Sequence, residues 1–306
     1  MNVRGQYSVL FDLAPLRRKV RKAADLALGR VPAQGPNFFI VGATRSGTTY
    51  LYDLLRQHPD VFMPENKELN YFNHDARYRP NLRGYYRSFI GYRGERAVGE
   101  ATPMYMELGT LYNDQNEGEV YRPENVIQRI AQHYPAARLI LSLRDPATRI
   151  FSIYEKNVGQ KKYFTPLAED LRRELSGSGS ELHLIYRNRY DIHLRNIFQH
   201  FDKDRVLVLI SEEWQRSPFE ALDGICGFLQ IPHSEIKQGS AKARNTREAY
   251  QEVDSRVIQQ LSQVPDDLLD EVIRELEPSR NYLEDLLERP LPWRRPRPAS
   301  IEAAPL

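Results

Sequence analysis

The chain carries the stretch FFIVGATRSGTTYL at residues 38–51, and this stretch decides the fold. An apolar strand is followed by a loop with the spacing Gly42-x-x-x-x-Gly47, and the pattern then predicts a helix from Thr48 to about Gln57. In that order, the backbone N–H groups of the loop and of the helix start form a cradle for a phosphate-like anion. Loops that bind nucleoside triphosphates place lysine directly after the second glycine. Here that position is Thr48, and the cation, Arg45, lies inside the loop.

Further buried strands are predicted near Ala97–Gly99, at Arg138–Leu143 and at Arg205–Ile210. Helical patterns separate them, including one over Tyr190–Phe201 and two around Pro265. Strands alternating with helices predict an α/β fold of the P-loop type, in which a central parallel sheet is flanked by helices in three layers. We expect a basic lead-in over residues 1–36, one domain over 37–293 and a flexible Pro- and Arg-rich tail over 294–306.

The interval 155–182 contains two adjacent lysines, a proline and a Ser-Gly repeat, and this composition predicts a mobile surface segment. Such a segment is either a lid over a substrate cleft or a loop with no role. The basic, amphipathic stretch from Val9 to Leu28 predicts a helix. Packing on the domain is favoured for this helix, and a peripheral membrane contact stays open.

The composition limits the function classes. A net charge of +2 over 306 residues favours no nucleic-acid partner. The single cysteine, Cys226, excludes an internal disulfide framework and predicts a cytoplasmic location. No apolar run reaches the roughly 20 residues that span a bilayer, and no secretory signal is recognisable. The seven histidines show no ligand spacing, so we expect no metal site, and we place His193 and His200 on helix surfaces.

A second motif is RLILSLRDPATRIFSIY at residues 138–154. The strand ends at Arg144, and the following helix carries Ser152 one to two turns later. Both side chains then reach the carboxyl edge of the sheet, where open α/β sheets bind ligands. The alternatives are a surface pair of Arg144 with Asp145 and a capping or solvent-facing serine.

Together the two motifs resemble those of sulfotransferases that use 3′-phosphoadenosine-5′-phosphosulfate (PAPS). The run Arg45-Ser46-Gly47-Thr48-Thr49 matches the 5′-phosphosulfate loop of that family, and Arg144 with Ser152 matches its 3′-phosphate signature. The resemblance covers about residues 37–293 and implies PAPS as co-substrate without a metal. It also implies a nucleotide contact from Lys242 and Arg244, although the loose pattern there favours a solvated charged loop.

The third motif is PENKELNYF at residues 64–72. A hydroxyl acceptor needs a base, and burial in an aromatic-walled cleft can raise a carboxylate pKa towards neutrality, so Glu68 is the candidate base. The motif is similar to that of the heparan-sulfate and carbohydrate branch. This similarity implies sulfonate or substrate contacts from Lys67 and a substrate contact at Asn70, where relatives have histidine. An exposed Lys67-Glu68 loop pair is the alternative.

The stretch GEATPMY at residues 99–105 resembles the acceptor-cleft segment of the same branch. The resemblance implies that Thr102 and Tyr105 line the cleft, although Thr102 and the proline after it equally fit a simple turn. Ala101 replaces a lysine of the relatives, which favours a less highly charged acceptor.

We therefore predict a soluble, bacterial-style sulfotransferase that acts on a hydroxyl or amine, with a sugar acceptor favoured. One alternative is a P-loop nucleotide kinase or hydrolase, which Thr48 and the strand-end Arg144 disfavour. The other is a non-catalytic module that binds anionic glycans.

Overall fold

The computed structural model describes residues 35–75, 77–108, 113–114, 119–120, 126–159, 165–180, 182–233 and 263–293. The predicted tail, almost all of the predicted lead-in, and the two predicted nucleotide contacts Lys242 and Arg244 lie outside these ranges.

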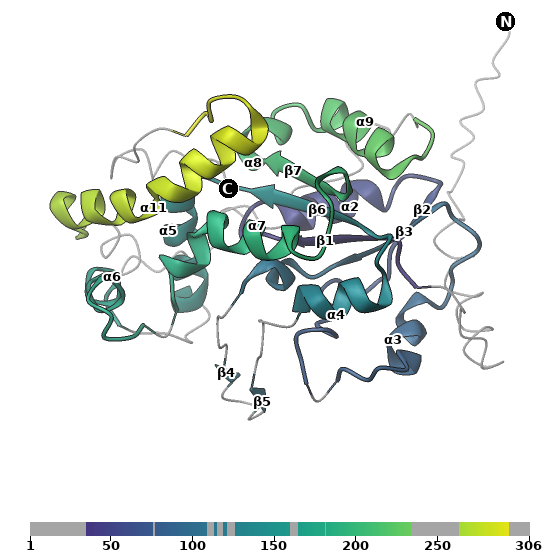
Figure 1. Ribbon diagram of the computed structural model, residues 1–306, viewed down its shortest axis with the longest axis horizontal. Helices are drawn as coiled ribbons and strands as arrows, with labels where there is room; N and C mark the ends of the chain where they lie inside the picture. Colours follow the sequence, from purple (N-terminus) through teal and green to yellow (C-terminus); the bar gives the residue numbers. More distant parts are fainter. Residues whose placement is uncertain are drawn as a thin grey trace, which may run out of the picture.

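Five parallel strands form the central sheet, in the order β2-β3-β1-β6-β7 (Figure 1). Side chains on the central strands are buried on both faces, as a sheet covered by helices on both sides requires. The predicted α/β architecture is confirmed. The strands are β1 (Phe38–Gly42), β2 (Val61–Phe62), β3 (Ala97–Ala101), β6 (Arg138–Leu143) and β7 (Val206–Ile210), and a separate antiparallel pair is β4 (Asn113–Asp114) with β5 (Glu119–Val120).

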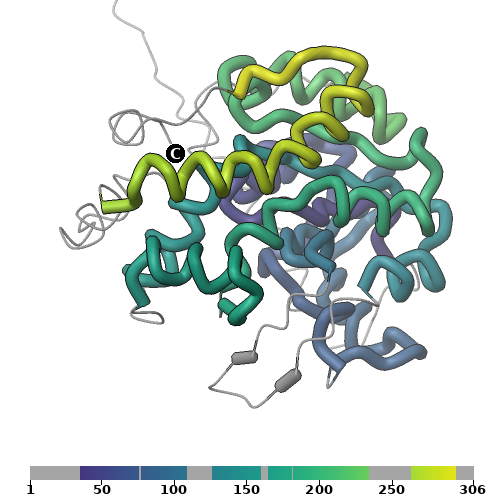
Figure 2. The backbone as a smooth tube through the Cα atoms, turned by 60° about the vertical axis from the view of Figure 1, so that its left-hand side comes forward, coloured from purple at the N-terminus to yellow at the C-terminus, as the bar shows by residue number. Residues whose placement is uncertain are grey.

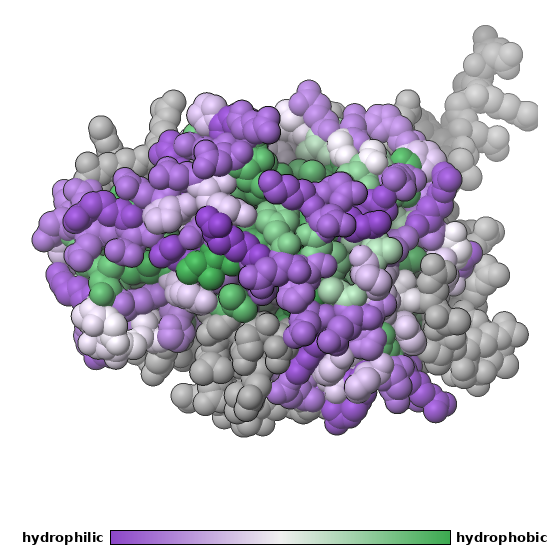
Figure 3. Space-filling model, viewed as in Figure 1, coloured by the Kyte–Doolittle hydropathy of each residue, from purple (hydrophilic) through white to green (hydrophobic). Residues whose placement is uncertain are grey.

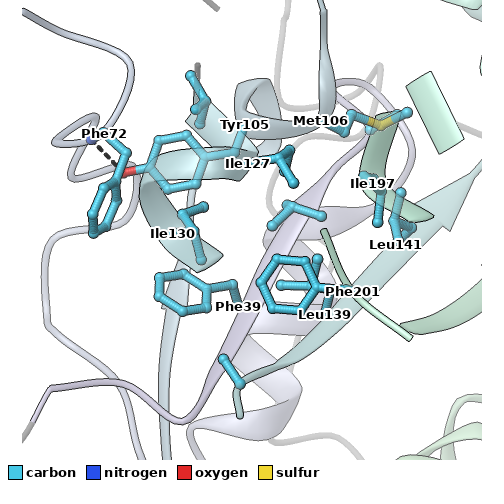
Figure 4. Packing of buried hydrophobic residues seen from close by; sticks show 14 of the residues in the cluster. Phe39, Phe72, Tyr105, Met106, Ile127, Ile130, Leu139, Leu141, Ile197 and Phe201 are labelled. Atoms are coloured by element: carbon cyan, nitrogen blue, oxygen red, sulfur yellow. Dashed lines mark hydrogen bonds between the residues drawn. The ribbon is translucent and has the colours of Figure 1, made fainter. Parts of the chain in front are cut away.

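Alternate residues of β1 face opposite layers. Phe39 and Val41 pack with α4 (Val126–His133) and α7 (Tyr190–Phe198) on one side of the sheet (Figure 4). Phe38 and Ile40 pack on the other side, against α2, α8 and α9. These three helices span Thr48–Leu55, Ser211–Trp214 and Pro218–Leu229. The first helix after the loop thus ends within two residues of its predicted end.

A third apolar cluster joins three helices beside the sheet. It contains residues of α5 (Pro146–Gly159), α6 (Leu167–Leu175) and α11 (Asp266–Leu287). Figure 2 shows the long α11 crossing this part of the molecule. The short elements are α3 (Arg83–Tyr86) and the 3-10 turns η1 (Arg87–Phe89), η2 (Pro103–Met106), η4 (Tyr186–Asn188) and η5 (Lys203–Arg205).

Two predictions are wrong. The segment 155–182 is not wholly a surface segment, because Leu167 and Leu171 of α6 are fully buried against α5 and α11. His193 does not lie on a helix surface, because its ring is fully buried. Its Nδ1 accepts the Leu108 N–H at 3.1 Å, and its Nε2 lies 3.1 Å from the carbonyl oxygen of Tyr186.

The visible surface in Figure 3 is mainly hydrophilic, with apolar residues in scattered patches. Within the described ranges, no helix combines the length and apolar character needed to cross a membrane.

Candidate active site

The loop between β1 and α2 has the features of an anion cradle. Gly47 is the residue before the first turn of α2 and lies in the left-handed region, at φ +79°. Because glycine has no side chain, it cannot cap the N–H groups of the helix start. The first N–H groups of a helix have no partner within it, so they are available to an anion. The Ser46 side-chain oxygen is buried and has no hydrogen-bond partner among the described residues. These features fit a loop that binds phosphate or sulfate oxygens.

Two neighbouring elements hold this loop in place. The Ser46 carbonyl accepts hydrogen bonds from the hydroxyls of Ser142 on β6 and Ser211 on α8. Trp214 Nε1 donates to Ser142 Oγ at 2.8 Å. A Cβ at Gly47 would lie 2.9 Å from a ring carbon of Trp214, so this position admits no side chain without movement. The loop is thus rigidly backed by the sheet and α8.

The first two predicted motifs meet. Arg45 Nε donates to Ser152 Oγ at 2.9 Å, although 107 positions separate the two residues. Ser152 is 3% exposed and Arg144 is 8% exposed. A solvent-facing serine and a surface Arg144–Asp145 pair are therefore both wrong. Burial lowers the pKa of Arg144, nearby Glu212 opposes this shift, and the charge of Arg45 adds to it.

A buried ion network, which the motifs did not reveal, also holds the loop. Glu107 pairs with Arg149 at 2.7 Å and with Arg187 at 2.9 Å. Arg149 additionally donates to the carbonyl and hydroxyl oxygens of Thr44 in the loop, at 2.7 and 2.8 Å. Burial alone would raise the pKa of Glu107, but the two arginines hold it below its usual value. The only sequence signal is an arginine, Arg149, beside the apolar residues of α5.

We call residues 65–73 the acceptor loop. Lys67 Nζ lies 2.9 Å from Glu68 Oε1, and the Glu68 side chain is 43% exposed. The Glu68 side chain is therefore more exposed than we predicted from the sequence, which placed it in a partly buried cleft. The Glu68 N–H donates to the Ala101 carbonyl at 2.9 Å, which joins the acceptor loop to the end of β3.

Thr102 and Tyr105, predicted to contact substrate, are each 1% exposed. The Thr102 hydroxyl accepts the Asn70 N–H at 3.3 Å, and the Tyr105 hydroxyl accepts the Tyr71 N–H at 2.9 Å. Their described bonds are therefore internal and hold the acceptor loop. Asn70 is half-buried, and its side chain donates to the Glu68 carbonyl at 3.0 Å. Substrate contacts by these three residues stay predictions.

Lys156 is a residue near the candidate site that the sequence interpretation did not name. It follows Ser152 by four positions on α5, so the two residues share one helix face. The Lys156 side chain is exposed as a whole. Partial desolvation of its ammonium group by surrounding protein atoms lowers the pKa of Lys156, Glu68 opposes this shift, and Arg45 and Lys67 add to it. The i, i+4 spacing from Ser152 was the available signal. Lys156 is thus near enough to charged groups of both the phosphate loop and the acceptor loop to feel their charges.

Among the described residues, no group of three or more His, Cys, Asp or Glu side chains is arranged to hold a metal ion.

Comparison with known proteins gives concordant matches. The family described as "Sulfotransferase family" matches residues 36–235. The membrane-associated sulfotransferase kil1 of Dictyostelium discoideum is 31% identical over 136 residues, which are 42% of this chain and 25% of that protein. The bifunctional heparan sulfate N-deacetylase/N-sulfotransferase 4 of Mus musculus is 24% identical over 65% of this chain and 23% of that protein.

The chain thus spans about a quarter of the length of these two curated relatives. The crystal structure of a sulfotransferase from Alicyclobacillus acidocaldarius is 27% identical, with a TM-score of 0.63, and the match covers 85% of this chain and 98% of that chain. Since the family match extends over about two thirds of the residues, this chain belongs to the sulfotransferase family.

Proposed function

We propose that the chain transfers a sulfuryl group from PAPS to a hydroxyl or amine of a carbohydrate or glycoconjugate. The observation that carries the proposal is the hydrogen bond from Arg45 to Ser152. It joins the phosphate loop to the residues that resemble a 3′-phosphate site. The Ser46 hydroxyl, which is buried and has no hydrogen-bond partner in the part of the chain that the structure describes, and the start of α2 fit a ligand rich in anionic oxygens.

PAPS supplies the activated sulfuryl group. Arg144 and Ser152 bind the 3′-phosphate and so set the position of the reacting sulfur. Arg45, Lys67 and the N–H groups of the phosphate loop stabilise charge on the sulfonate and on the departing 5′-phosphate. Each such donor contributes about 3 kcal/mol to transition-state stabilisation. The loop donors are those of Gly47, Thr48 and Thr49.

Glu68 accepts the acceptor proton while the acceptor atom bonds to sulfur and the bond from sulfur to the 5′-phosphate oxygen breaks in line. Its exposed carboxylate is open to an acceptor that approaches from solvent, and Lys67 at 2.9 Å orients it. Relatives named for heparan sulfate support a sugar acceptor. Ala101, in place of a lysine, supports an acceptor with fewer negative charges. The lone cysteine, which is buried, supports a cytoplasmic location.

The test uses labelled PAPS with a panel of unsulfated polysaccharides, neutral oligosaccharides and amino sugars. Glu68→Gln should lower turnover about 10²- to 10⁴-fold, the contribution of a positioned base, and leave the affinity for adenosine-3′,5′-bisphosphate unchanged. Glu65→Gln, which alters an exposed carboxylate of the same loop, is the matched control and should keep full activity.

Full activity of Glu68→Gln would exclude this residue as the base. Nucleotide binding without transfer to any acceptor of the panel would instead favour a glycan-binding module.

A further inference from the structure

Glu100 on β3 is a buried carboxylate that the proposed reaction does not use. It is 1% exposed and forms no ion pair with any described residue. Its Oε1 accepts the Thr102 hydroxyl at 2.7 Å, and its Oε2 accepts the Tyr85 hydroxyl. Burial raises the pKa of Glu100 to about 7, against the opposing effect of its hydroxyl partners. A buried carboxylate without a countercharge is costly, so a role in holding its neighbours is indicated.

The neighbours of Glu100 hold the acceptor loop. The Thr102 hydroxyl, while donating to Glu100, accepts the backbone N–H of Asn70 at 3.3 Å. One turn later, the Tyr105 hydroxyl accepts the N–H group of Tyr71 at 2.9 Å. It also accepts the N–H group of Phe72 at 3.4 Å (Figure 4). Hydroxyls at the end of β3 therefore fix three consecutive N–H groups of the loop.

The backbone of the acceptor loop needs this support. Glu68 has φ +65° and Asn70 has φ +50°. Both lie in the left-handed region, which is unfavourable for glutamate and better tolerated by asparagine. Such conformations persist only where the surrounding contacts determine them. The direction of the Glu68 side chain thus depends on the bonds that residues on either side of it make with the end of β3.

We propose that Glu100 is a positioning residue that acts through the Thr102 hydroxyl to hold the acceptor loop in the conformation that presents Glu68. This inference rests on the proposed function, in which Glu68 is the base. Glu100 is too deeply buried to touch donor or acceptor. When ionised, it accepts both hydroxyls. When protonated, the oxygen that carries the proton donates instead of accepting, so the hydroxyl facing it must turn its own proton elsewhere. Where that hydroxyl is the one of Thr102, the hold on the loop weakens.

The groups that face Glu100 are all uncharged at neutral pH. They are Tyr85 of α3, Thr102 at the end of β3, Tyr105 of η2 and Tyr134 after α4. No lysine, arginine or histidine of the described residues bonds to it. The charge of Glu100 therefore decides whether both hydroxyls can donate to it at once.

The first experiment compares Thr102→Val with Thr102→Ser by hydrogen–deuterium exchange of the peptide that covers residues 65–73. Valine has nearly the same shape but neither accepts the Asn70 N–H nor donates to Glu100, whereas serine does both. We expect exchange to accelerate at least tenfold in Thr102→Val and to be unchanged in Thr102→Ser. A peptide from α9 is the internal reference. Equal exchange in wild type and Thr102→Val would overturn the proposal.

The second readout is turnover. Because a misplacement of about 1 Å can cost a factor of about 10² in rate, kcat of Thr102→Val should fall about 10- to 100-fold. The affinity for adenosine-3′,5′-bisphosphate should stay within twofold of wild type, and Thr102→Ser should restore kcat. Faster exchange with unchanged kcat would refute the positioning role. Absence of turnover in wild type would count against the proposed function, while the exchange experiment would still decide whether Thr102 holds the loop.

Glu100→Gln separates positioning from a merely structural contribution, because glutamine keeps the shape and cannot ionise. The turnover rate of wild type should decrease as the pH falls through about 7, where Glu100 takes up a proton. The variant should lack this step in its pH–rate profile. Superimposable pH–rate profiles of wild type and variant would contradict the proposal.

Discussion

Replacing Arg144 by alanine should remove selectivity for a 3′-phosphate. Arg144 is 8% exposed, so folding has already removed most of the water from its guanidinium group before a ligand binds. The positive charge of nearby Arg45 adds to the attraction of this region for an anion. A charge-assisted hydrogen bond contributes about 1.5–3 kcal/mol. Since about 1.4 kcal/mol equals a tenfold change, Arg144→Ala should weaken adenosine-3′,5′-bisphosphate about 10- to 100-fold.

The assay is a calorimetric titration of wild type and variant with adenosine-3′,5′-bisphosphate and with adenosine-5′-monophosphate, which lacks the 3′-phosphate. Affinity for the monophosphate should stay within about twofold. The matched control is Arg96→Ala, an exposed arginine directly before β3 at the opposite edge of the sheet, which should change neither affinity. Equal losses for the two nucleotides, or no loss for either, would show that Arg144 does not bind the 3′-phosphate.

Three further outcomes are expected. Glu107→Gln leaves two buried arginines without their carboxylate and should lower the free energy of unfolding by about 3–5 kcal/mol. Glu169→Gln removes the carboxylate of an exposed ion pair and should lower it by less than about 1 kcal/mol. Similar denaturation midpoints for the two variants would refute the role of the network. Burial lowers the pKa of His193 to about 4 in the folded chain, compared with the usual value near 6.5. Between pH 4 and 6.5 the unfolded chain therefore binds more protons than the folded chain. The free energy of unfolding of wild type should fall by about 3 kcal/mol as the pH decreases over that range. His193→Gln should remove this part of the pH dependence in denaturant titrations at pH 5 and pH 7, and an unchanged dependence would exclude His193 as its source. Sulfuryl transfer should persist in excess EDTA, and a loss that Mg²⁺ restores would favour a phosphotransferase.

The sheet could be predicted because its strands are short apolar runs buried on both faces. The phosphate loop could be predicted because its glycine spacing and Arg45 lie within one short stretch. Helix α6 could not be predicted as buried. Its two fully buried leucines, Leu167 and Leu171, lie among charged residues between a lysine pair and a Ser-Gly run, so composition suggested a surface segment. Tertiary packing against α11 decides their burial.

The candidate site was predictable where chemistry is concentrated in local motifs. Arg45 and Ser152 meet as the two motifs imply. The Glu107 network was not predictable, because its partners are 42 and 80 positions apart and no local pattern connects them. The exposure of Glu68 also depends on what covers the acceptor loop, which no motif specifies.

We propose that this site binds a nucleotide through its 3′-phosphate without a metal ion. The most direct test is a calorimetric titration of the wild-type chain with adenosine-3′,5′-bisphosphate and with adenosine-5′-diphosphate, each with and without Mg²⁺. We predict tight binding of the bisphosphate that is independent of Mg²⁺, and much weaker binding of the diphosphate. Preferential binding of the Mg²⁺-bound diphosphate would contradict a metal-independent 3′-phosphate site.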